Sequence, residues 1–187
     1  TPLASWKIPG AKLEVAMVKK PAVQERLARL KDRYLAVATA TICERAREEN
    51  LVYYGRAGHH LLPGVSHVLR LHVLPEHGQR LDNVMARLKL SREKAEKFLQ
   101  DVDGDLRAWV KFVHGSDMDD AGKYDLVLNL EHMNIENAAS AICSIAELPD
   151  FKATPASRLA FQDRLLQAEA RIRLALDAQT GEADLTV

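Results

Sequence analysis

Glycines and an arginine after an apolar segment are the residues of this chain best suited to chemistry. The order Gly55-Arg56-Ala57-Gly58 directly follows the apolar residues 51–54. A guanidinium presents a planar fork of N–H donors that matches a phosphate group, and glycines let a backbone approach a ligand closely. This turn is therefore a candidate anion site. The alternative is a surface arginine in a tight turn.

Further charged residues lie on the predicted helices. Arg80 falls on a helix predicted over 76–88, and Asp103 and Arg107 fall on the long helix that follows it. Taken by themselves, Arg80 and Arg107 are typical of a solvated helix face.

The elements that must position these residues alternate along the chain. Apolar runs at 51–54, 68–74 and 124–129 predict strands, and a short strand over 13–18 is weakly indicated. Helical patterns fill the intervals at 22–49, 76–88, 91–113 and 134–147, and a long C-terminal helix is predicted over 155–177. Alternation of this kind predicts an α/β fold, a parallel sheet flanked by helices, in which ligands bind at the carboxyl ends of the strands.

Composition narrows the classes of partner. The 187 residues carry no net charge, so no general attraction to nucleic acid or to an anionic membrane is expected. No apolar run approaches the length of a membrane-spanning helix. Cys43 and Cys143 are far apart and follow no metal-ligand spacing, which favours reduced thiols in a cytoplasmic protein.

Two clusters invite a metal interpretation. Five histidines fall between His59 and His77, and an acidic loop contains Asp117, Asp119 and Asp120. The histidines lack the helical His-x-x-x-His spacing of a zinc site, and the acidic loop is typical of a solvated turn. We therefore predict no metal site in either place.

Residues of about 51–146 resemble the cytidylate-kinase-like family of P-loop kinases. The resemblance is carried by the segments 52–62, 71–80, 90–95 and 124–129, in that order and at that spacing. It implies a P-loop kinase-like fold whose main domain spans 1–150.

The family resemblance implies roles for single residues. Gly55, Arg56 and Gly58 would bind the phosphate of the acceptor nucleotide. Arg80 and Arg107 would neutralise charge in the transition state, and Asp103 would orient the acceptor or the lid helix. The chain departs from the family pattern at two positions where a basic residue is expected and where Asn83 and Leu106 stand.

The larger departure concerns the ATP site. No Gly-x-x-x-x-Gly-Lys-Ser/Thr, nor a looser glycine-rich version, occurs in these residues. Two explanations stay open: the sequence is a fragment whose phosphate loop lies before Thr1, or another strand, such as 13–18, fills that place in a degenerate kinase. ATP and Mg²⁺ are thus implied only by the resemblance.

The expected function is that of a nucleotide-kinase-like domain, related to ATP-dependent phosphorylation of a pyrimidine nucleoside monophosphate but inactive as this isolated chain. The alternative is a non-catalytic nucleotide-binding or regulatory domain of a larger bacterial protein. A small-molecule nucleotide is the expected partner, with a homodimer as a further possibility. Residues 151–187 form a second segment whose end, from Arg164 on, resembles the start of a BON domain, a small bacterial module.

Overall fold

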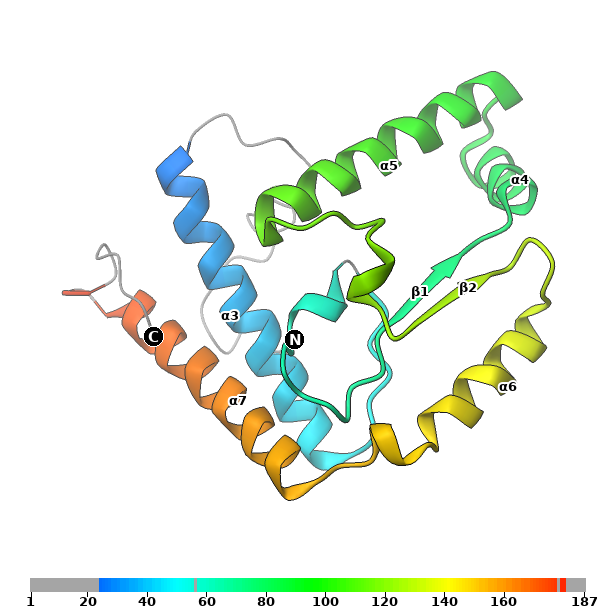
Figure 1. Cartoon of the computed structure of the whole chain (residues 1–187). Helices are drawn as coiled ribbons and strands as arrows, with labels where there is room; N and C mark the ends of the chain where they lie inside the picture. The colour runs from blue at the N-terminus through cyan, green and yellow to red at the C-terminus, as the bar shows by residue number, and fades with distance from the viewer. Residues whose placement is uncertain (1–23, 56, 178, 181–187) are drawn as a thin grey trace. The chain divides into compact units, whose positions relative to one another are not determined.

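The computed structural model of the chain describes residues 24–55, 57–177 and 179–180, with the side chains of 24–28 left aside (Figure 1). The predicted strand over 13–18, Arg56, and the segment 184–187 lie outside the described residues. The backbone divides into two compact units. The sheet unit is Ser66–Ala153, and the helical unit is formed by Thr1–Val65 with Thr154–Val187.

The sheet unit is built on two parallel strands. β1 (Leu71–Leu74) pairs with β2 (Leu126–Asn129), with Leu71 opposite Leu126. Both lie within segments predicted as strands, and both are shorter than predicted. Leu128 is buried, whereas the strand residues Val73 and Val127 are about two-fifths exposed.

The strand starts are joined by hydrogen bonds between two residues. The backbone N–H of Arg70 donates to Oδ2 of Asp125 at 2.7 Å, and the N–H of Asp125 donates to the Arg70 carbonyl at 2.9 Å. The Arg70 guanidinium lies 3.5 Å from the same carboxylate. These bonds fix the register of the two strands at their amino ends.

Three helices complete the sheet unit. α4 (His77–Leu88) packs on α5 (Arg92–His114) through Leu81, Ala95 and Leu99. α5 runs without a break through Gly104. α6 (Ile135–Ala146) begins after Asn134, whose side chain accepts a hydrogen bond from a backbone N–H of the first turn. Short 3₁₀ turns lie at Ala121–Lys123 (η2) and Pro149–Phe151 (η3).

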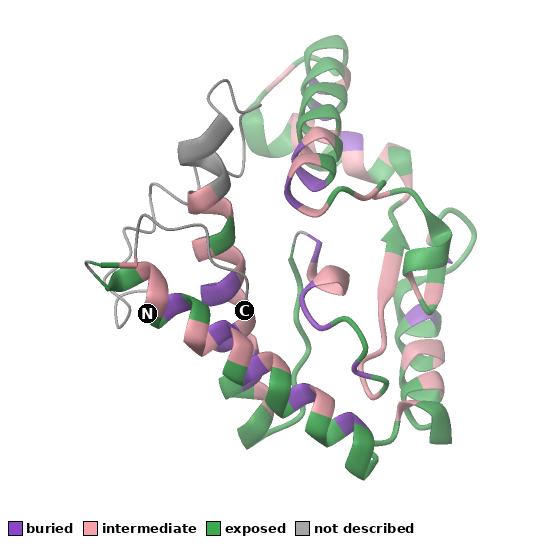
Figure 2. Cartoon of the chain, turned by 60° about the vertical axis from the view of Figure 1, so that its left-hand side comes forward, coloured by how far each residue is buried: buried purple, intermediate pink, exposed green. Residues whose placement is uncertain are grey.

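The helical unit consists of α3 (Gln24–Glu48) packed along α7 (Pro155–Leu176), with the 3₁₀ turn η1 at Gly58–His60. Figure 2 shows buried positions on both long helices. The buried apolar residues are Ala36, Val37, Ala40 and Cys43 on α3 and Phe161, Leu165, Ala168 and Ile172 on α7. Small residues in both sets let the two helices approach closely. α7 begins with a capping box between Thr154 and Ser157.

Residues 51–54 are not a strand, and this prediction was wrong. Val52 is 94% exposed and Tyr54 is fully exposed. An extended segment becomes a strand only when its backbone pairs with a neighbour. In the part of the chain that the structure describes, the sheet contains β1 and β2 alone. The apolar segment 51–54 therefore does not pair its backbone with a neighbouring strand there.

The fold class is confirmed as mixed α/β with a long C-terminal helix, and it is dominated by helices. Five α-helices and one small parallel sheet make up the described residues. None of the helices described here is long and apolar enough to cross a membrane.

Candidate functional site

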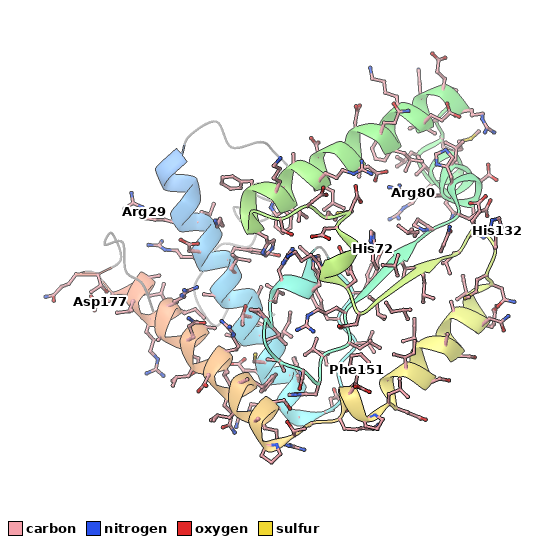
Figure 3. The ribbon with its side chains drawn as sticks, in the orientation of Figure 1. Arg29, His72, Arg80, His132, Phe151 and Asp177 are labelled. Atoms are coloured by element: carbon pink, nitrogen blue, oxygen red, sulfur yellow. The ribbon has the colours of Figure 1, made fainter. Side chains whose placement is uncertain are left out.

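Arg80 and Asp103 form a two-bond ion pair between α4 and α5. Nη1 of Arg80 donates to Oδ2 of Asp103 at 2.6 Å, and Nη2 donates to Oδ1. Figure 3 shows Arg80 extending from α4. The two side chains are 33% and 27% exposed, so water reaches the pair without surrounding it. Two residues predicted for one site are thus in direct contact.

The pair fixes both the charge and the direction of the Arg80 side chain. Its hydrogen bonds to Asp103 raise the pKa of Arg80 above its ordinary value, and burial opposes this with a smaller effect. Of the five guanidinium N–H groups, the fork uses one on each terminal nitrogen. The guanidinium therefore retains further N–H groups. These can donate hydrogen bonds to an anion while Asp103 holds the Arg80 side chain in place.

Arg107 lies one helical turn beyond Asp103 on α5. Its Nε donates to Oδ2 of Asp119 at 2.8 Å, and both side chains are about half exposed. That hydrogen bond raises the pKa of Arg107, and the more distant charges of Asp103 and Asp117 act in the same direction. Asp103 thus acts electrostatically on both predicted arginines.

Asp119 contacts Arg107, but the sequence did not predict Asp119 as part of a phosphate site. Its backbone N–H donates to Oδ1 of Asp117 at 2.9 Å, which closes a short turn within the acidic loop. The signal available in the sequence was the acidic run itself, read there as a solvated turn. The fold of the loop decides which of its acidic residues contacts Arg107. The spacing of these residues in the sequence does not predict that contact.

The acidic loop is tied to the sheet through Tyr124. The Tyr124 hydroxyl donates to the Met118 carbonyl at 2.8 Å, and its ring stacks on His72 of β1 with the centroids 4.7 Å apart. Burial raises the pKa of Tyr124, and the nearby charges of Asp119, Asp117 and Asp120 add to the effect. This anchor limits where Asp119 can present its carboxylate to α5.

Gly55 and Gly58 lie in the helical unit, on either side of Arg56, which is outside the described residues. The ring of Tyr53 covers both glycines: a Cβ at Gly58 would lie 2.5 Å from Cδ1 and Cε1 of that ring. Ala57 has a left-handed backbone with φ of 54°. The turn is therefore tight, and its glycines leave room for the ring of Tyr53.

The predicted residues divide between the two units. Arg80, Asp103 and Arg107 come together in the sheet unit, where Asp119 joins them. Gly55 and Gly58 belong to the helical unit. The sheet unit thus contains a cluster of charged residues from α4, α5 and the acidic loop, with two arginines each held by a carboxylate.

The described residues do not fit an ATP or a Mg²⁺ site. Parallel sheets hold phosphates where a strand passes into a helix through a glycine-rich loop. Here β1 is followed by Pro75 and Glu76, and β2 by residues 130–134, which contain neither glycine nor lysine. Among the residues the structure covers, no three His, Cys, Asp or Glu side chains gather as they would around a metal ion. No step involving either group is assigned to these residues.

Comparison with known proteins gives one family. A model described as the cytidylate kinase-like family matches residues 9–132, which is more than half of the chain. No curated protein matches the chain. The match includes α3, α4, α5 and both strands, and it ends before α6 and α7. The BON resemblance of the C-terminal segment gains no support from these comparisons.

Proposed function

Because the chain belongs to the cytidylate kinase-like family, we propose that its sheet unit binds the phosphate group of a nucleoside monophosphate. Arg80 and Arg107 are the proposed phosphate ligands, and Asp103 is the proposed positioning residue. The observation that carries this proposal is the two-bond ion pair of Arg80 with Asp103. The kinase-like domain is proposed to span residues 1–150, and the segment 151–187 that follows it packs its helix α7 along α3.

The ion pair supports phosphate binding through pre-organisation. A free arginine side chain loses rotamer freedom when it binds a ligand, at a cost of roughly 0.5–1.5 kcal/mol. Asp103 has already ordered Arg80 in the ligand-free protein. A phosphate that accepts from the remaining N–H groups would then meet a cation whose orientation is set.

Arg107 supports the proposal through its exposure. Its bond to Asp119 is half exposed on both sides, and ion pairs of that kind contribute about 0–1 kcal/mol. A dianionic phosphate can therefore replace Asp119 as the partner of Arg107 at small cost. Arg80 would keep Asp103 as its partner when the phosphate binds, whereas Arg107 would exchange Asp119 for the phosphate.

The proposal does not extend to catalysis by this chain alone. The family resemblance implies a pyrimidine base and a phosphate-binding role for Gly55, Arg56 and Gly58, which stays an expectation separate from the site in the sheet unit. Phosphoryl transfer from ATP needs a phosphate loop, which these 187 residues lack. We therefore favour nucleotide binding without turnover in the isolated chain, in a kinase-like or a regulatory role.

Calorimetric titration of the full chain with CMP tests the proposal. Arg80→Ala should weaken CMP binding at least about tenfold, because an arginine–phosphate pair is charge-assisted and bidentate. Arg80→Lys should recover part of the loss, since it restores charge but not the fork. The matched control is Arg92→Ala, which removes an exposed arginine of α5 that pairs with Glu96 in the next turn.

Three outcomes decide the question. Loss of binding in the Arg80 variants with normal binding in the control supports the proposal. Equal CMP affinity in the Arg80→Ala protein, or no binding of CMP by the unmodified chain, contradicts it. Consumption of ATP in the presence of CMP would contradict the part of the proposal that denies turnover to the isolated chain.

A further inference from the structure

A pocket of about 170 Å³ lies within the helical unit, and none of Arg80, Asp103 and Arg107 belongs to that unit. It is bounded by α3, by the segment after η1, and by α7. Its floor is made partly by Ala36 and Ala168, which are both buried and small. The small side chains at this point of helix contact leave the space open.

The polar lining of this pocket is rich in hydrogen-bond donors. Arg164 and Arg171 lie seven residues apart on α7, which is about two turns, so both face the same side of the helix. His60 and Thr39 contribute from the other elements. Among the described residues that line the pocket, two are arginines and none is acidic, so this part of the lining is positively charged.

Arg164 is held in place by its neighbours. Its Nε donates to the Pro63 carbonyl at 3.2 Å, and its Nη1 donates to Oε1 of Gln167 at 3.1 Å. Nη2 takes part in neither bond. A guanidinium fixed in this way at the wall of a cavity presents a ready-made donor to a ligand, as Arg80 does in the sheet unit.

We propose that this pocket is a second binding site, specific for a small oxyanion of the phosphate type. Two guanidinium groups match the charge of such a ligand, and each carries N–H donors suited to its oxygens. The volume suits inorganic phosphate or a short phosphorylated group, since pockets for drug-sized molecules run to roughly 300–1,000 Å³. The site goes beyond the proposed function, because Arg164 and Arg171 lie outside the residues that match the family.

The shared chemistry has two sources, free phosphate and the phosphoryl group of a nucleotide. The Arg80→Ala protein separates this pocket from the site in the sheet unit. In that background, orthophosphate should still bind, as followed by ³¹P NMR line width during titration. CMP at the same concentration should not displace it, because a nucleoside is too large for the pocket.

Variants of α7 locate the binding. Arg171→Gln should weaken orthophosphate binding at least about fivefold, and its exposed position limits any effect on folding. Arg164→Lys tests the half-buried arginine with the charge kept and should weaken binding because the fork is lost. The control is Arg173→Gln, which makes the same change at an exposed position of α7 that does not line the pocket.

The outcomes are decisive in each case. Weaker phosphate binding in the Arg171 variant with normal binding in the Arg173 variant supports the site. Equal binding in both variants, or no line broadening by orthophosphate in the Arg80→Ala protein, overturns it. CMP binding that depends on Arg171 while orthophosphate does not bind would overturn the assignment to a small oxyanion. Failure of CMP to bind at Arg80 leaves this proposal intact, so the two proposals fail separately.

Discussion

Asp103 accepts two hydrogen bonds from Arg80, and this pair links α4 to α5 beside the apolar contact of Leu81 with Ala95 and Leu99. The same two residues are proposed to form the core of a phosphate site. Removing either one therefore acts on stability as well as on binding. Experiments on the site must separate the two effects, and a measurement of stability without ligand does so.

The first prediction concerns the coupling energy of this pair. In a double-mutant cycle with Arg80→Ala and Asp103→Ala, we expect a coupling of about 1–2 kcal/mol in the free energy of unfolding. The two-bond geometry of the pair favours a coupling energy in the upper part of this range. The partial exposure of both side chains to water favours the lower part. Urea unfolding of the four proteins without ligand measures the coupling. A value near zero would show that the pair does not stabilise the contact between α4 and α5.

The second prediction concerns Arg107 and Asp119, which provide a contrast. Their single hydrogen bond joins side chains that are 54% and 49% exposed. We expect a coupling below about 0.5 kcal/mol, and less at high salt, because exposed ion pairs are well screened. The same urea experiment applies, with Asp101→Ala as a control for removing an acid from an exposed position of α5. A coupling as large as that of Arg80 with Asp103 would contradict the view that Arg107 exchanges partners easily.

The sequence predicted the helices well because their signals are local. Asn134 and Thr154 lie at or next to the predicted starts of two helices, and the side chain of each accepts a capping hydrogen bond. The segment 51–54 shows the limit of such reasoning. Apolar β-formers indicate an extended chain, but only a neighbouring strand makes a sheet, and a neighbour is a property of the whole fold.

The candidate site was predictable in its residue types and not in its pairing. Arg80, Asp103 and Arg107 were chosen from a family pattern, which gives positions along the chain. The contact between Arg80 and Asp103 depends on the packing of α4 on α5, and that of Arg107 with Asp119 depends on the path of a polar loop. Hydrophobic periodicity carries no information on either.

The third prediction concerns pH and Cys43. Burial raises the pKa of the Cys43 thiol to about 11 from 9.0, with a smaller contribution from the charge of Glu44. The unfolded chain therefore loses this proton first as the pH rises. The contribution of Cys43 to stability is fully present below pH 9 and is lost between pH 9 and 11, with a slope of up to about 1.4 kcal/mol per pH unit.

Comparison with a Cys43→Ala protein isolates this effect. Tyr53 and Tyr124 also have raised pKa values because of burial, so both proteins lose stability in alkali. The difference between their unfolding free energies should narrow from pH 9 to pH 11. A constant difference over that interval would mean that the folded thiol ionises as readily as the unfolded one.

The fourth prediction concerns the glycine turn and Tyr53. Gly58→Ala should destabilise the protein by about 1 kcal/mol, because the new methyl group would press on the Tyr53 ring. In a Tyr53→Ala background the same change should be nearly neutral, since the obstacle is gone. The measurement is again urea unfolding of the two single variants and the double variant.

Gly64 provides a matched control for this cycle in the same unit. Its φ is +79°, and a Cβ there would meet nothing within 4 Å. Gly64→Ala should therefore cost about 1–2 kcal/mol through backbone strain alone, and this cost should be the same with or without Tyr53. If the Gly58 variant is equally destabilised in both backgrounds, the glycine is needed for its backbone and not for the ring. The close packing of Tyr53 on the glycine turn would then not be the reason for the glycine.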